Sequence, residues 1–337
     1  MATETANVVT VHALHAGFLT LPERFFINPP TTQQARNTVP SLSFLIQHHA
    51  PSGDVTRLIF DLGIRRDPAL YNTDIRKHIA TRLPLSGDPD VVAALARGNL
   101  TPSNVDCVIL SHVHWDHVGM PSDFPEAQFI VGNGSLALLC GSSRKASGNG
   151  SHSHFETNLL PLDRTVELSS PIPIGPEADE LLPEKPLLPS AAAATPSTTR
   201  RSWKPRGHFP HTIDLFSDGS VLLVDAPGHL PGHLNLLCRV GRGDPGKEKY
   251  VYLAGDACHD RRILTGEKGI AQWSDPQFPG QVCCIHADRD EALETIKKIR
   301  VLEQRRSVFG EVEVVLAHDA RWAGDAARDG RFFPGSL

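Results

Sequence analysis

Apolar residues fall into short runs that are separated by polar and turn-forming residues along most of the chain. Short apolar or β-branched runs between such breaks are typical of strands, whereas apolar residues three or four positions apart indicate a helix. Because the strands come in two groups with helices between them, the pattern predicts a layered α/β domain. Strands are predicted at 8–21, 41–46, 57–63, 105–110, 129–131, 213–216, 221–224, 249–254 and 312–316, and helices at 74–82, 89–97 and 290–306.

The regular pattern breaks off between residues 141 and 202. Residues 141–150 are rich in Ser and Gly, and residues 171–201 are rich in Pro, Ala, Ser and Thr. Such a composition buries little apolar surface, so we expect a long and flexible surface insertion. We therefore expect a single domain, 1–337, that carries one insertion at about 141–202. Whether the insertion covers a site as a lid or is disordered stays open at this point.

Four potential metal ligands follow the predicted strand at 105–110. They are His112, His114, Asp116 and His117, within the run 111–119. On an extended or turn-like backbone His112 and His114 point the same way, while Asp116 and His117 come from the following turn. Imidazole and carboxylate together suit zinc or a similar divalent ion. The sequence therefore predicts a metal site, and these ligands supply two neighbouring ions more easily than one.

The composition narrows the classes of function. The formal net charge is −5, so no basic surface for nucleic acid is expected. No apolar run approaches the roughly 18 residues of a membrane span, and the polar start of the chain does not resemble a secretory signal. Six cysteines in 337 residues do not make a disulfide scaffold, which favours a reducing compartment, the cytoplasm.

The run from His112 to His117 resembles the signature of the metallo-β-lactamase superfamily. Four further motifs of that superfamily are found in the right order, and together the five extend from about residue 40 to 320. On these motifs the chain is identified as a member of the superfamily. The four are Phe60-Asp61-Leu62-Gly63, Ala226-Pro227-Gly228-His229, Leu253-Ala254-Gly255-Asp256-Ala257 and Leu316-Ala317-His318-Asp319.

The resemblance implies an αββα sandwich with two divalent ions, expected to be zinc, at one edge of the sheets. Asp61 resembles the carboxylate that orients the ligands. His229 is preferred over His233 because the superfamily pattern places the ligand directly after Pro-Gly, and His233 is then a structural histidine. The implied ligands are His112, His114 and His229 for the first ion, Asp116, His117 and His318 for the second, and Asp256 as the bridge.

Two adjacent divalent ions make a water acidic enough to act as a nucleophile near neutral pH. We therefore expect metal-assisted hydrolysis, in which Asp116 could carry a proton to the leaving group. The motifs look most like those of N-acyl-homoserine-lactone lactonases, which carry a tyrosine where this chain has His259. Because histidine can protonate an amide leaving group, the expected substrate is a small lactone or γ-lactam. A detoxifying role would follow from that chemistry.

Other activities of the same fold stay open at this stage. A glutathione-thioester hydrolase would need a basic patch near the end of the chain, for which Arg305, Arg306 and Arg321 are candidates. The acidic balance weighs against cleavage of phosphodiesters. A redox enzyme with a single iron would lose ligands of the second ion, whereas His117 and His318 are both present. The oligomeric state does not follow from the sequence.

Overall fold

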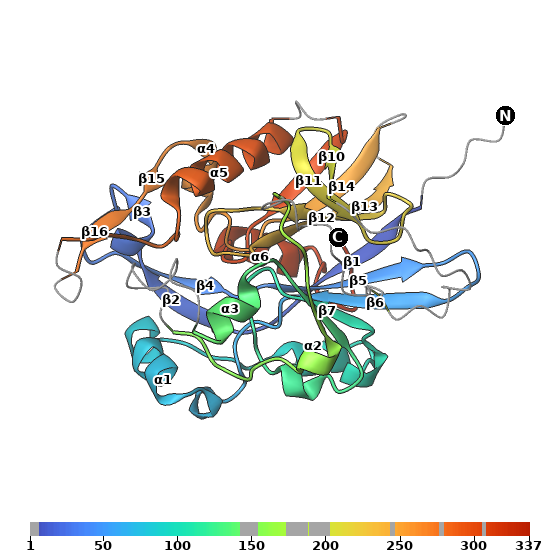
Figure 1. The fold of residues 1–337 in the computed structure, drawn as a ribbon, viewed down its shortest axis with the longest axis horizontal. Helices are drawn as coiled ribbons and strands as arrows, with labels where there is room; N and C mark the ends of the chain where they lie inside the picture. Colours follow the sequence, from blue (N-terminus) through green and yellow to red (C-terminus); the bar gives the residue numbers. More distant parts are fainter. Residues whose placement is uncertain are drawn as a thin grey trace.

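Two six-stranded sheets pack face to face and carry helices on their outer sides (Figure 1). The computed structural model describes residues 7–141, 154–172, 188, 203–242, 247–275, 280–304 and 308–337. The predicted insertion at 141–202 lies largely outside these residues, so its flexibility stays a prediction. Within the described ranges, no helix is long and apolar enough to cross a membrane.

The first sheet consists of β1 (Val9–Leu14), β5 (Ser43–His49), β6 (Val55–Phe60), β7 (Cys107–Ile109), β8 (Gln128–Val131) and β9 (Thr165–Glu167), in that order across the sheet. The pairs β1–β5 and β5–β6 are antiparallel, whereas β6, β7, β8 and β9 are parallel. β9 lies within the predicted insertion, so part of that segment belongs to the sheet.

The second sheet consists of β10 (Lys204–Arg206), β11 (Phe209–Asp214), β12 (Val221–Asp225), β13 (Leu234–Arg242), β14 (Glu248–Leu253) and β18 (Glu311–Val315), again in that order. Neighbouring strands from β10 to β14 are antiparallel, and β18 is parallel to β14. β12 and β14 therefore run in the same direction on the two sides of β13.

Three further strand pairs lie outside the main sheets: β2 (Phe18–Pro22) with β4 (Arg36–Pro40), β3 (Ile27–Asn28) with β15 (Gly269–Ile270), and β16 (Gln272–Ser274) with β17 (Val282–Cys284). The prediction of one strand at 8–21 was wrong, because the run divides into β1 and β2 at Gly17. Gly17 has a φ of +93°, and a Cβ there would lie 2.5 Å from the Ser86 carbonyl oxygen. Glycine is therefore required at the turn that leads β2 out of the sheet.

The helices are α1 (Thr73–Ile79), α2 (Val91–Ala96), α3 (Ser135–Leu139), α4 (Arg261–Thr265), α5 (Arg289–Glu303) and α6 (Ala320–Arg328). Apolar side chains of both sheets, such as Ile109 and Leu236, form the core between them. α2 and α3 pack on the outer face of the first sheet, and α4 and α5 pack on that of the second. This order of layers confirms the predicted αββα sandwich.

The directions of the strands decide where the loops meet. β6 and β7 are parallel, so the loops that follow them leave the first sheet at the same edge. β12, β14 and β18 run in one direction, so the loops after them also share one edge of the second sheet. All five predicted motifs follow directly after these five strands. The fold therefore gathers residues from distant parts of the sequence in one place.

Replacing Leu236 by Ala should destabilise the protein because its side chain is fully buried between the sheets. The cavity should lower the free energy of unfolding by about 2–5 kcal/mol. Urea denaturation of both proteins measures the difference. Leu162→Ala is the matched control, since Leu162 is 68% exposed and should cost less than about 0.5 kcal/mol. Equal losses in the two variants would contradict this account of the core.

Candidate metal centre

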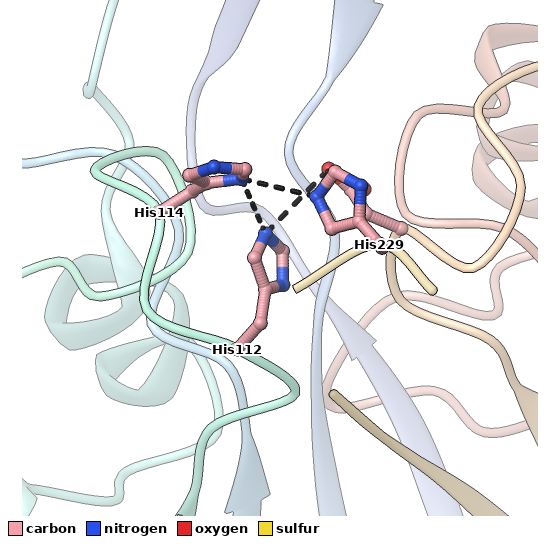
Figure 2. Close-up of side chains that lie close together, drawn as sticks. His112, His114 and His229 are labelled. Atoms are coloured by element: carbon pink, nitrogen blue, oxygen red, sulfur yellow. Dashed lines mark hydrogen bonds and ion pairs between the residues drawn. The ribbon is translucent and has the colours of Figure 1, made fainter. Parts of the chain in front are cut away.

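Three histidine side chains converge at the edge of the sandwich (Figure 2). His112 and His114 lie on the loop after β7, and His229 lies on the loop after β12. The Nδ1 atom of His114 lies 2.9 Å from Nε2 of His112 and 3.0 Å from Nε2 of His229. All three side chains are buried. The structure thus brings together the three histidines that the motifs assign to the first ion.

A second group consists of Asp116, His117 and His318, whose ligand atoms lie within 4.8 Å of one another. Nε2 of His318 is 3.7 Å from an oxygen of Asp116. Nδ1 of His318 is hydrogen-bonded to the carbonyl oxygen of Pro40 at 2.7 Å, so this nitrogen donates and Nε2 is turned toward the group. The three residues predicted for the second ion are therefore also gathered, next to the first group.

The carboxylate of Asp256 lies between the two groups. Its Oδ2 atom is 3.7 Å from Nε2 of His112, 3.6 Å from Nε2 of His229 and 3.3 Å from Nε2 of His117. Its Oδ1 atom is 3.2 Å from Nε2 of His318. Oδ2 therefore lies near histidines of both groups and Oδ1 near His318 of the second group, so the carboxylate is in reach of both groups, as expected of the predicted bridge.

Asp61 holds the ligand loop from behind. Its Oδ1 accepts a hydrogen bond from the backbone N–H of Ser111 at 2.7 Å, and its Oδ2 accepts one from the Ser111 hydroxyl at 2.7 Å. Oδ2 also lies 2.9 Å from Nδ1 of His117, and the Ser111 hydroxyl lies 2.9 Å from Nδ1 of His112. One buried carboxylate therefore orients a histidine of each group, as the resemblance predicts for Asp61.

The structure separates the roles of His229 and His233. Nε2 of His233 accepts a hydrogen bond from the backbone N–H of Asp256 at 3.1 Å, so this nitrogen is engaged with the backbone. His229 instead points its Nε2 at His114 and Asp256, and its ring lies edge-on to that of His112. His233 is therefore bonded to the backbone, as expected of a structural histidine.

The electrostatics of the first group suit a cation. Burial, followed by neighbouring histidines, holds the pKa of His112 and His229 well below its usual range, so both imidazoles are neutral and have a free lone pair. Three nitrogens around a tetrahedral zinc would lie about 3.3 Å apart, which is close to the separations found here. Neutral imidazoles whose acceptor nitrogens lie close together in a buried space are suitable ligands for a divalent metal ion.

The second group and the bridge carry the complementary charge. Burial opposes ionisation of Asp256, but His318, His117 and His259 outweigh it and keep the pKa of the carboxyl well below its usual range. Within the described residues, the buried atoms His117 Nε2 and Asp256 Oδ1 make no hydrogen bond of good geometry. Atoms that are buried without such a bond, around an ionised carboxylate, are what a site for divalent ions requires.

His259 lies inside the site and not on the surface. Its Nε2 atom is 3.1 Å from Oδ2 of Asp256, and its ring lies against His229 and Phe26. With Asp256 it lines a pocket whose other walls include Leu19, Leu21 and Trp115. Leu19 and Leu21 of β2 therefore form an apolar wall of this pocket, and Trp115 is one of its side walls.

Several residues of the site carry no signal in the sequence. His286 is buried between β17 and α5, with its ring 5.2 Å from those of His229 and His259, and these three also form a group with metal-ligand spacing. His78 and Arg82, at the end of a predicted helix, line the pocket. Of the basic residues considered for a thioester substrate, Arg305 and Arg306 lie outside the described residues, and Arg321 is exposed on α6.

No protein-family model matches the chain. The cytochrome P450 monooxygenase mpaDE' of Penicillium brevicompactum is 27% identical in an alignment of 337 positions, which covers 95% of this chain but 34% of that protein. The chain thus spans about a third of this relative. The metallo-hydrolase mfmC of Annulohypoxylon moriforme is 27% identical over 94% of this chain and 80% of its own length. The gamma-lactamase FDB1 of Fusarium pseudograminearum is 27% identical over 71% of this chain and 50% of its own.

Solved structures share the fold at low sequence identity. An N-acyl homoserine lactone hydrolase, with the product N-hexanoyl-L-homoserine at its catalytic metal centre, has a TM-score of 0.60 and 16% identity over 98% of this chain and 100% of the other. AidC, a dizinc quorum-quenching lactonase, has a TM-score of 0.54 and 13% identity over 93% and 88%. With five motifs in order, this fold and both ligand groups in place, the chain has the metallo-β-lactamase fold and resembles the metallo-hydrolases and lactonases of that superfamily.

Proposed function

We propose that this chain is a hydrolase that opens a small cyclic ester or cyclic amide, a lactone or γ-lactam, with the help of two zinc ions. The observation that carries the proposal is the Asp256 carboxylate, which lies between two groups of buried ligands at the wall of a pocket. Two adjacent divalent ions, when bound there, supply an acidified water and a Lewis acid for the substrate carbonyl.

The ligand assignment follows the geometry of the two groups. His112, His114 and His229 would hold the first ion, and Asp116, His117 and His318 would hold the second. Asp256 would bridge the two. The presence of both His117 and His318 in the second group supports two ions over the single-iron alternative. The dizinc lactonase of the same fold supports zinc as the metal.

Residues of the chain itself then handle the substrate and its protons. Asp116 lies at the pocket, where a carboxylate oxygen can take a proton and pass it to the leaving group. His259 is within hydrogen-bonding distance of Asp256 and lines the pocket, so its ring can donate to the substrate carbonyl or to the leaving atom. The apolar wall formed by Leu19, Leu21 and Phe26 restricts access of water on the other side.

The substrate class rests on the relatives and on one substitution. The likeness to a gamma-lactamase and to homoserine-lactone hydrolases supports a small ring that contains an acyl group. His259 stands where the lactonases resembled by this chain carry a tyrosine. An amine leaving group needs a proton more than an alkoxide does, so histidine extends the range from lactones to γ-lactams. Detoxification of such compounds in the cytoplasm is part of the proposal, in line with the six free cysteines.

Replacing His114 or Asp256 by Ala should abolish hydrolysis, because each variant removes a proposed metal ligand for which alanine offers no substitute. We expect kcat/KM for a γ-lactone to fall by more than about 100-fold. Losing a residue that only hydrogen-bonds to a metal ligand costs about 10- to 100-fold, and losing a ligand itself should cost more. Turnover and metal content by mass spectrometry measure the effect. His49→Ala, at an exposed histidine, is the control and should keep both. Full activity in either ligand variant would refute the proposal.

Asp61→Asn should weaken the second metal site through the tautomer of His117. The new amide N–H₂ would face Nδ1 of His117 and force the ring proton onto Nε2, the atom that points at Asp256. We expect the affinity for one of the two ions to fall by about 10- to 100-fold. Competition with a chromophoric chelator measures it. Asp54→Asn is exposed and serves as the control; unchanged affinity for both ions in Asp61→Asn would contradict this role.

Two variants at His259 separate its roles. His259→Phe removes the hydrogen-bond donor and should lower kcat by about 100-fold for both the lactone and the γ-lactam. His259→Tyr keeps a hydrogen-bond donor, but tyrosine is a weaker acid than a protonated histidine. This variant should therefore preserve lactone hydrolysis and lose γ-lactam hydrolysis. Metal content should not change in either variant, and this is measured together with the rates. If His259→Phe retained wild-type rates on both rings, His259 would have no part in the reaction.

A further inference from the structure

The pocket beside the candidate metal centre contains a buried arginine. Arg82 ends the short 3-10 helix η3 (Ala80–Arg82), which continues α1, and only 8% of the residue is exposed. It lines the same pocket as Trp115, Asp116 and His259. A permanent positive charge is therefore present on the wall of the site where a substrate would bind.

Comparison with the other buried arginines shows what Arg82 lacks. Arg65 pairs with Glu156 at 2.5 Å, and Nε of Arg239 lies 3.5 Å from the carboxylate of Glu248. For Arg82, no carboxylate within 4.0 Å and no hydrogen-bond acceptor is found among the residues that the structure describes. Because a buried charge without a partner is costly, a counter-charge from outside the chain would be strongly favoured at this position.

The charged groups around Arg82 make a counter-charge still more favourable. Burial lowers the pKa of Arg82 to about 10, Asp116 opposes the shift, and Arg36 and Arg24 add to it. The guanidinium is still protonated near neutral pH. Asp116 forms no ion pair with it, and in the proposed centre the charge of Asp116 is taken up by the second ion. This wall of the pocket is therefore positive and suited to an anion.

We propose that the substrate carries a carboxylate, which Arg82 binds while the cyclic carbonyl lies at the candidate metal centre; this inference rests on the hydrolase function proposed above. The planar guanidinium offers paired N–H donors that match the two oxygens of a carboxylate. The pocket combines apolar walls with a few polar side chains, which suits a small ring with one such substituent. Leu19, Leu21 and Phe26 provide the apolar contact for the ring.

His78 lies on the same wall and is neutral. Burial, followed by the charge of Arg82, lowers the pKa of His78 to about 3. Its ring packs edge-on against Trp115. His78 can therefore hydrogen-bond to a ligand without adding positive charge, and the selection for an anion rests with Arg82.

The test compares substrates that differ in charge and hardly in shape. The γ-lactone 5-oxooxolane-2-carboxylate and the γ-lactam 5-oxopyrrolidine-2-carboxylate carry the group, and their primary carboxamides do not. For whichever ring the metal-loaded protein opens, kcat/KM should be at least about 10-fold higher for the carboxylate than for the carboxamide. A preference below about threefold would overturn the inference and leave the proposed hydrolase function standing.

Calorimetric titration of the metal-loaded protein with the same compounds distinguishes the two possible failures. Tighter binding of the carboxylates without ring opening would refute the hydrolase function but keep Arg82 as a carboxylate site. Equal binding of carboxylate and carboxamide would refute the site itself. The titration therefore tests the carboxylate site even if the protein opens neither ring.

Variants of Arg82 test whether this residue causes the preference. Arg82→Met removes the charge and should lower the carboxylate-to-carboxamide ratio of kcat/KM by about 10- to 100-fold. It should not lower the thermal stability, because it removes an unpaired buried charge. Arg82→Lys keeps the charge without the planar donors and should retain part of the ratio. Arg76→Met, on the exposed side of α1, is the matched control and should leave the ratio unchanged.

Two outcomes of the variants would overturn the inference. One is an unchanged ratio in Arg82→Met. The other is an equal loss for charged and uncharged substrates, which would mean that Arg82 acts on the carboxylate produced by ring opening or on the fold. If Arg82→Met does not fold, Arg82→Lys decides, since a wild-type ratio there would exclude recognition by the paired donors of the guanidinium.

Discussion

The ionised carboxylate of Asp256 is buried among histidines, and the rest of the site is arranged around it. An ionised group can be buried only where opposite charge or hydrogen-bond donors compensate the loss of water. His117, His259 and His318 each approach one of its oxygens within 3.3 Å. They come from loops after β7, β14 and β18, so the compensation depends on three strands ending at the same edge.

The second constraint is the contact of Asp61 with the ligand loop. Asp61 fixes the Ser111 backbone and hydroxyl, and through them His112, while the same carboxylate faces His117. A shift of the loop would therefore change both ligand groups together. Because Asp61 itself follows β6, the parallel pairing of β6 and β7 is what holds the two loops in register.

The pocket beside the centre combines three kinds of wall. The N-terminal strand β2 supplies apolar side chains, the metal-ligand loops supply acidic and imidazole groups, and the end of α1 with η3 supplies a guanidinium. Such a combination favours a small ring with a polar reacting group on one side and a negative substituent on the other. Under the proposed function, the segments around the motifs would select the substrate, and the motifs would supply the metal ligands.

The sequence by itself determined which metal-ligand motifs are present and in what order, because such motifs are local. Through the family resemblance that these motifs carry, the run from His112 to His117 and the single ligands after three later strands implied both ligand groups and the sandwich fold. The tertiary structure alone decided the rest. The division of the first apolar run at Gly17, the position of His286 and the burial of Arg82 depend on contacts between segments far apart in the chain. A cation at a helix end looks solvated in a sequence, and only packing reveals that it is buried with no ion-pair partner among the described residues.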